Sequence, residues 1–150
     1  MQAAVLPPSH PDSERSVLGA MLQDPEAVLL AQELLSPAAF YQPAHRELFD
    51  AMVSLSRLGK PVDLVTVDEE LSRRGTLEGV GGTQYLVQLT QYVPTTANVR
   101  AYIDIVDEKF TLRQLIDCAN RIHQECHSMD RPLPEILSWV EKQIFDISMR

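Results

Sequence analysis

The last third of the chain carries two runs of apolar residues whose spacing predicts a helical hairpin. No proline or glycine interrupts residues 95–131, a run far longer than the ~12 residues of an average helix. Within it, apolar positions recur at alternating steps of three and four, the spacing of a coiled-coil seam. After a break at residues 127–134 that is rich in turn formers, a second run shows the mirrored spacing. The first run is Leu112, Leu115, Ala119, Ile122 and Cys126, and the second is Leu133, Leu137, Val140, Ile144 and Ile147.

If the chain folds back at the break, the two runs face each other in antiparallel order. The residue numbers of each facing pair then add up to the same value, as an antiparallel hairpin requires. We therefore predict a helical hairpin with its tip near Met129. The facing pairs are Cys126 with Leu133, Ile122 with Leu137, Ala119 with Val140, Leu115 with Ile144, and Leu112 with Ile147.

The start of the long helix has its apolar residues on another face. Val99, Ile103, Val106 and Phe110 lie about 170° around the helix from the later run, so the first half should belong to a globular head. Two helices alone bury only one stripe each, which leaves further apolar side chains for a protein–protein interface. Packing of some of them back onto the head remains the alternative. These side chains are Ile116, Cys118, Ile136, Trp139 and Phe145.

The residues before the hairpin show shorter helical patterns separated by proline and glycine. Asp12 or Ser13 is expected to cap the first helix, and Thr95 or Thr96 the long one. Thr66 with Glu69 forms a capping box, which predicts a helix from Val67 to about Arg74. Residues 62–67 alternate like a strand, but the stretch is too short to count. The prediction is an all-α protein with a flexible lead-in (1–12), a compact multi-helix head (13–111) and a protruding antiparallel hairpin (112–150).

Composition and charge argue against several classes of function. The net charge is −8, and an acidic surface repels phosphate, so this chain should not bind DNA or RNA tightly. No apolar run approaches the ~18 residues of a membrane span, and the N-terminus has no secretion signal. Cys118 and Cys126 would lie about 12 Å apart on one helix, too far for a disulfide. We expect a reduced, cytoplasmic protein.

No catalytic or cofactor site emerges from the sequence. His123, Cys126 and His127 resemble metal ligands, but their order is not H-E-x-x-H and no fourth ligand is evident, so the prediction is no metal site. The acidic residues 63–70 fit a helix N-terminus better than acid–base catalysis. No phosphate-binding glycine motif is present. His45 receives no catalytic role, and Tyr85 is expected to pack in the core.

Six short motifs follow one another along the chain, and together they are specific although none is decisive alone. In sequence and order they resemble the N-terminal domain of bacterial replicative DNA helicases, the DnaB family, over nearly the whole chain. The motifs are Glu14 to Leu22 (ERSVLGAML), Phe40-Tyr41 with His45 to Phe49 (HRELF), Gly59 to Leu71 (GKPVDLVTVDEEL), Gly81-Gly82 with Tyr85-Leu86, Val93-Pro94-Thr95 with Asn98, and Tyr102 with Ile105-Val106.

The resemblance implies a helical head whose hairpin pairs with that of another subunit, the dimers forming a triangular collar on a hexameric ring. It also implies docking of the primase helicase-binding domain, and in some relatives of a helicase loader. The ATP- and magnesium-dependent 5′–3′ motor would follow residue 150, so this chain should have no unwinding activity and no cofactor. The interface is carried over to Leu112, Leu115, Ile116, Ala119, Ile122, Ile136, Leu137, Trp139, Val140 and Ile144.

Two other functions remain open at this stage. One is a stand-alone helical interaction domain or enzyme with a metal at His123, Cys126 and His127. The other is a DNA-binding helical bundle, against which the net charge of −8 argues.

Overall fold

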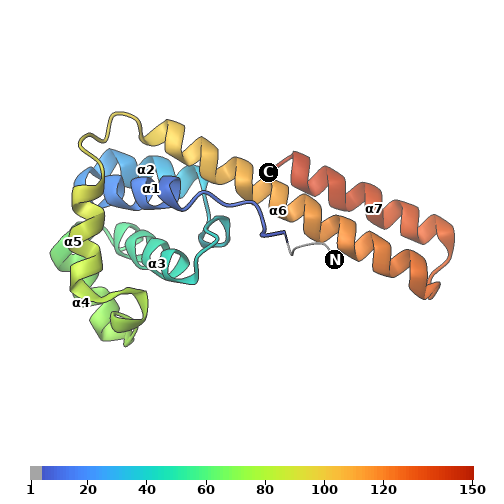
Figure 1. The fold of residues 1–150 in the computed structure, drawn as a ribbon, viewed down its shortest axis with the longest axis horizontal. Helices are drawn as coiled ribbons and strands as arrows, with labels where there is room; N and C mark the ends of the chain where they lie inside the picture. Colours follow the sequence, from blue (N-terminus) through green and yellow to red (C-terminus); the bar gives the residue numbers. More distant parts are fainter. Residues whose placement is uncertain (1–4) are drawn as a thin grey trace. The chain divides into compact units, whose positions relative to one another are not determined.

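The computed structural model describes residues 5–150, and every regular element in that range is helical, which confirms the all-α prediction. Two single-turn 3₁₀ helices lie between α-helices of the head. Figure 1 shows the elements in order: α1 Pro11–Gln23, α2 Pro25–Leu34, η1 Pro37–Ala39, α3 Pro43–Arg57, α4 Leu64–Arg74, η2 Glu78–Val80, α5 Gly82–Tyr92, α6 Val99–Ser128 and α7 Leu133–Ser148.

The chain forms two compact units. The head spans Ser9–Glu108, and the hairpin unit comprises Lys109–Arg150 together with residues 5–8. The sequence suggested a boundary a few residues later, between Thr111 and Leu112. Within residues 5–150, no helix combines the length and the apolar character that crossing a membrane requires.

Helix α1 begins earlier than the sequence suggested. Its N-cap is His10, whose Nδ1 accepts a hydrogen bond from the Ser13 amide at 3.1 Å, and Pro11 occupies the first turn. The predicted cap at Asp12 or Ser13 is therefore wrong, because both residues already lie inside the helix. Asp12 instead forms an ion pair with Arg15. Of the predicted flexible lead-in, residues 1–4 lie outside the described residues.

Helix α4 also begins before its predicted start. Asp63 is the N-cap: its carboxylate accepts from the Thr66 amide and the Thr66 hydroxyl accepts from the Asp63 amide, both at 2.9 Å. The capping box thus joins Asp63 and Thr66 rather than Thr66 and Glu69, and residues 64–67, which alternate like a strand, belong to the helix. Gly75 ends α4 at a φ of 75°, a left-handed conformation that glycine adopts without strain.

The core of the head lies around α1, which packs against α2, α3 and α5. Leu18 and Met21 on α1 are fully buried, as are Phe40 and Phe49, whose ring centroids are 5.0 Å apart. Gly19 permits the close crossing of α1 and α5, because a Cβ at this position would lie 2.3 Å from the Leu89 carbonyl oxygen.

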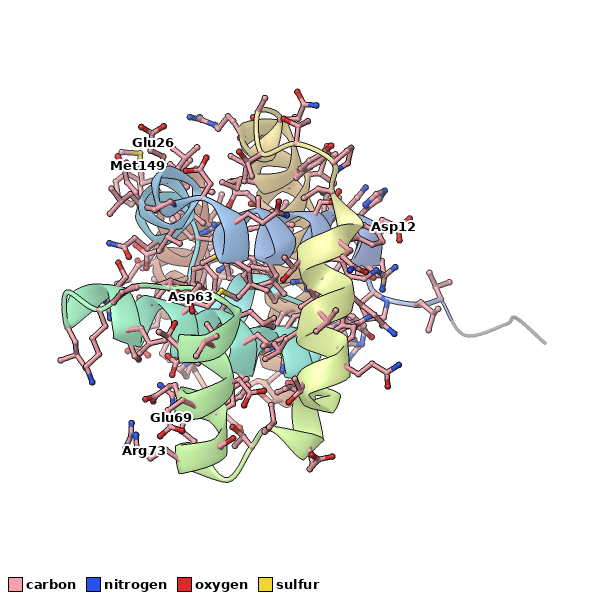
Figure 2. All side chains as sticks on the ribbon, turned by 90° about the vertical axis from the view of Figure 1, so that its left-hand side faces the viewer. Asp12, Glu26, Asp63, Glu69, Arg73 and Met149 are labelled. Carbon is pink, nitrogen blue, oxygen red and sulfur yellow. The ribbon has the colours of Figure 1, made fainter. Side chains whose placement is uncertain are left out.

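Glu70, one of the acidic residues on α4, has structural partners, as expected. Glu70 accepts hydrogen bonds from Arg73 at 2.7 and 2.8 Å and from Arg74 Nε at 2.7 Å. Arg74 also reaches α3, where it contacts Glu47 at 3.1 Å and Asp50 at 2.9 Å. In Figure 2, Arg73 projects from the outer side of α4. These ion pairs fasten α4 to α3.

The start of α6 differs from prediction in two ways. The helix begins at Val99, so neither Thr95 nor Thr96 is its cap, and the Thr96 hydroxyl instead donates to Asp24 at 2.9 Å. Val99 and Ile103 are buried in the head, as expected. However, the face they define lies only about 100° from the face that α6 buries later in the hairpin, and not on the opposite side.

The predicted hairpin is present, with α6 and α7 running antiparallel (Figure 1). Met129, at the tip, adopts a positive φ of 54°. Near the tip, Arg131 contacts Glu125 at 3.0 Å. At the other end of the hairpin, the Arg113 guanidinium donates to the Pro8 carbonyl oxygen at 2.8 Å and thereby attaches the preceding segment to α6.

Candidate interaction surface

The two hairpin helices meet along a line that is rotated from the predicted one. Cys118 on α6 and Ile136 on α7 are the most buried side chains of the hairpin, at 1% and 7% exposure. The sequence placed both beside the seam. Leu115 and Leu137, which were predicted to lie in the seam, are 39% and 53% exposed. The contact face of each helix is therefore turned by somewhat less than one 100° residue step.

The predicted seam residues consequently separate into two groups. Ile122, Val140 and Ile147 remain partly buried along the contact line. The others are exposed within the hairpin, so the facing pairs that contain them do not form a buried seam. The exposed group consists of Leu112, Leu115, Ala119, Cys126, Leu133, Leu137 and Ile144.

These exposed apolar residues lie on one face of the hairpin. On α6, Leu112, Leu115 and Ala119 are turned by about 60° to 120° from Cys118 in one rotational sense. On α7, Leu137 and its neighbours are turned from Ile136 in the same sense by similar angles. Since the helices are antiparallel, the same sense on both points to the same side of the pair. We call this surface the apolar face; it comprises Leu112, Leu115, Ala119, Leu133, Leu137 and Ile144. Ile116 is also exposed, but it lies about 160° around α6 from Cys118 and points away from α7.

The other side of the hairpin is polar. Asp117 and Arg121 form an ion pair on α6 at 3.4 Å, and Lys142 and Asp146 form one on α7 at 2.9 Å. A hollow of about 200 Å³ between the helices is lined mostly by polar side chains, among them Asp117, Arg121 and Asp146, together with Ile147. The hairpin is thus amphipathic as a whole and not only helix by helix.

Trp139 is the one predicted interface residue that the hairpin places toward the polar side. Two guanidinium groups lie over its ring, with the central carbons of Arg121 and Arg131 at 5.7 and 5.4 Å from the ring centroid. Such cation–π contacts fix the indole without burying it completely. Of the remaining predicted residues, Ile136 is buried inside the hairpin and cannot contact another protein.

Inside the head, a second constellation links three helices through polar side chains. Glu14 Oε1 on α1 lies 2.7 Å from His45 Nδ1 on α3, and His45 Nε2 lies 2.6 Å from Tyr85 Oη on α5. Glu14 Oε2 also accepts from the Tyr41 amide at 2.7 Å. Glu14 and His45 are 2% and 0% exposed. Tyr85 is only partly buried, so it does not pack fully in the core as expected. We call Glu14, His45 and Tyr85 the buried relay.

One arrangement of hydrogen-bond donors and acceptors satisfies all three side chains of the buried relay. If His45 Nδ1 donates to the Glu14 carboxylate, Nε2 is free to accept from the Tyr85 hydroxyl, which satisfies every buried polar atom of the three. Burial raises the pKa of Tyr85 above its ordinary value of 10.0, partly opposed by the positive charge of Arg15. His45 is enclosed and cannot reach a substrate. The relay is therefore suited to fastening helices together rather than to reacting.

The histidine and cysteine side chains at the hairpin tip are not grouped as three or more metal ligands within residues 5–150. His123, Cys126 and His127 are exposed on the last turns of α6, and both cysteines of the chain are free thiols. In the part of the chain that the structure describes, no three His, Cys, Asp or Glu side chains are grouped to hold a metal.

Comparison with known proteins connects this architecture to one family. The model of the DnaB-like helicase N terminal domain matches residues 6–108, which include the whole head. The chain belongs to this family.

Relatives and solved structures agree with the DnaB assignment. The chain is 42% identical over 145 residues to the replicative DNA helicase DnaC of Bacillus subtilis (strain 168), covering 97% of this chain and 32% of that protein. It superposes with a TM-score of 0.88 and 39% identity on the crystal structure of the N-terminal domain of DnaB helicase from Mycobacterium tuberculosis, covering 94% of this chain and 99% of that one.

A further solved structure is that of a DnaB-like replicative helicase and its interactions with primase. It matches with a TM-score of 0.74 and 28% identity, covering 92% of this chain and 31% of that one. Like this match, the one to the Bacillus subtilis relative covers only about a third of the other protein's length.

The buried relay gives a physical reason for part of the DnaB-like motif series. Glu14, His45 and Tyr85 come from three of the six motifs, and the fold brings them into one hydrogen-bonded chain. Gly19, from the first motif, permits the crossing of α1 and α5. Sequence reasoning treated these residues separately, because no local pattern links three motifs that lie far apart in the chain.

Proposed function

We propose that this chain is the assembly and docking domain of a replicative DNA helicase, and that its hairpin pairs with the hairpin of a second copy through the apolar face. The observation that carries the proposal is the concentration of exposed leucine and isoleucine side chains on one side of the hairpin. Exposed apolar patches of this kind are typical of protein–protein contacts.

The size of the apolar face is compatible with a reversible dimer. Helix α7 has 16 residues, so the hairpin is about 24 Å long, and two helices side by side are about 20 Å wide. One face then has a projected area of roughly 450 Å², and two such faces bury an area near the lower end of specific interfaces. We therefore expect dimers at micromolar concentration.

The charge distribution favours the same pairing. Residues 109–150 contain six Lys and Arg and six Asp and Glu, so the hairpin helices carry no net charge, and the whole excess of −8 belongs to the head. Two hairpins can approach without net repulsion. The acidic head, in contrast, opposes tight binding of DNA to this domain.

For the whole protein, we infer a replicative helicase whose motor lies outside these 150 residues. Its activity would be ATP- and magnesium-dependent 5′–3′ unwinding in the cytoplasm, with no cofactor bound by the domain described here. The dimers would assemble as a trimer of dimers on the hexameric ring. Primase, through its helicase-binding domain, is the proposed partner, because a structural relative is known in its interactions with primase. A helicase loader is a further candidate partner.

Sedimentation velocity at micromolar concentration tests the pairing. The unmodified chain should be dimeric and Leu115→Asp monomeric, because a carboxylate in an apolar contact costs about 3 kcal/mol or more, which weakens association more than hundredfold. Leu29→Asp is the matched control, since Leu29 is an exposed leucine (58%) in the head. Circular dichroism should show equal helix content in all three proteins.

The pairing proposal fails if the unmodified chain is monomeric or if Leu115→Asp remains a dimer. Docking is tested separately by titrating a primase helicase-binding domain into the unmodified chain and into Leu115→Asp. We expect binding to the dimer and weaker binding to the monomeric variant. Absence of binding to the dimer would contradict the docking role while leaving the pairing intact.

A further inference from the structure

The last turns of α6 carry two histidines that face the same way. His123 and His127 are four residues apart, both are exposed, and their ring centroids lie 4.4 Å from each other. Both are turned by roughly 140° to 180° around α6 from Cys118, which marks the contact with α7. The pair therefore points away from α7 and is open to a hydrated ion.

We propose that His123 and His127 chelate one divalent transition-metal ion, Zn²⁺ or Cu²⁺, as a two-donor site on the helix surface. Imidazole nitrogens bind Zn²⁺ at about 2.0–2.1 Å, which places each ring centroid about 3.2 Å from the metal. If the angle between the two nitrogen–metal bonds lies between a right angle and the tetrahedral value, the two ring centroids are about 4.5–5.2 Å apart. The observed 4.4 Å needs only a small side-chain rotation to reach this geometry.

The surroundings leave the pair with two protein donors. Glu125 is held by Arg131 at 3.0 Å, so its carboxylate is already occupied. Cys126 is an exposed free thiol on the same turn, but no third donor is grouped with the histidines in residues 5–150. Water would fill the remaining coordination positions. The C-terminal end of a helix also favours a nearby cation, because its unpaired carbonyl groups carry partial negative charge.

This site goes beyond the proposed function and does not depend on dimer formation. A metal that bridges His123 and His127 joins two successive turns beside the hairpin tip. Since it binds the folded helix and not the unfolded chain, it also stabilises the end of α6.

Calorimetric titration of ZnCl₂ and CuCl₂ into the full chain, purified without a histidine tag, tests the proposal. We expect one ion per chain, with Cu²⁺ bound more tightly than Zn²⁺. His127→Gln should weaken binding at least about tenfold, because the metal bound by His123 then lacks the second imidazole that the helix holds close to it. The matched control combines His127→Gln with Gln124→His, which keeps the number of histidines but places them on adjacent residues, about 100° apart.

Cys126→Ser should bind metal as tightly as the unmodified chain. The proposal is overturned if the adjacent-histidine control binds as tightly as the unmodified chain, if His127→Gln retains full affinity, or if Cys126→Ser loses it. His127→Gln should keep the metal-free oligomeric mass and helix content of the unmodified chain. A failure of metal binding is thus distinguishable from a failure of the proposed pairing.

Discussion

Replacing His45 with leucine should destabilise the head by several kcal/mol. The substitution removes the ring that contacts Glu14 Oε1 at 2.7 Å, while Glu14 itself stays 2% exposed. The imidazole is neutral when Nε2 accepts from Tyr85, so the substitution removes a hydrogen bond to a buried carboxylate, and leaving such a charged group without its partner costs roughly 3 kcal/mol. The cost is not larger because the Tyr41 amide still donates to the other carboxylate oxygen. For a domain of this size, the melting temperature should fall by about 6–12 °C.

A double-mutant cycle separates the Glu14–His45 interaction from other losses. Glu14→Gln keeps an acceptor for the Tyr41 amide but removes the charge, which should cost about 1.5–3 kcal/mol. If the two side chains act as one unit, the double variant should be less destabilised than the sum of the single variants, by about 1–3 kcal/mol. Glu33→Gln is the control, because Glu33 is exposed on α2 and its replacement should change stability by less than about 0.5 kcal/mol.

The assay is urea denaturation followed by circular dichroism, with all variants at one protein concentration because the proposed dimerisation would contribute to apparent stability. The reasoning is refuted if His45→Leu loses less than about 1 kcal/mol, or if the two substitutions are additive. Either result would mean that the relay is a packing detail and that Glu14 finds another partner.

Two further predictions concern α4 and the crossing of α1 and α5. Hydrogen bonds from Arg73 and Arg74 lower the pKa of Glu70 from its ordinary value of 4.5. Its stabilising effect is therefore complete above that value and is lost as the pH falls toward the folded-state pKa. Glu70→Gln should reduce the acid dependence of the unfolding free energy, and an unchanged dependence would contradict the role of the pair. Gly19→Ala should destabilise by about 1–3 kcal/mol in thermal denaturation, because the new Cβ would meet the Leu89 carbonyl oxygen. Gly79→Ala, where nothing lies within 4 Å, should be neutral by comparison.

The sequence predicted the existence of the hairpin but not which residues lie inside it. The three-and-four spacing fixes a helical period and a point of reversal, and both follow from the chain itself. It does not distinguish a stripe that meets the other helix from a stripe that is left exposed. Here the leucine-rich stripe is exposed, and the smaller Cys118, together with Ile136, forms the close contact. Small side chains permit close helix packing, and spacing alone does not show this preference.

The buried relay escaped prediction for a different reason. Glu14, His45 and Tyr85 are separated by 31 and 40 residues, so no local periodicity connects them. Helix caps were also shifted: His10 and Asp63 cap helices whose starts were predicted later. A histidine is an uncommon cap, and two overlapping capping patterns compete between residues 63 and 69. Local sequence patterns predicted that the helices exist. Contacts between distant segments determine where the helices begin and which polar side chains are buried.

The apolar face is exposed because α6 and α7 meet along a line that is rotated from the predicted seam. Had Leu112, Leu115, Leu137 and Ile144 packed between α6 and α7, the hairpin would be a self-sufficient pair with a polar exterior. Instead the hairpin closes on Cys118 and Ile136 and leaves its larger aliphatic side chains exposed. Exposing them is unfavourable for an isolated chain, since each buried leucine contributes about 1.5–3 kcal/mol. The exposed leucines are therefore the main physical argument for the proposed pairing of two hairpins.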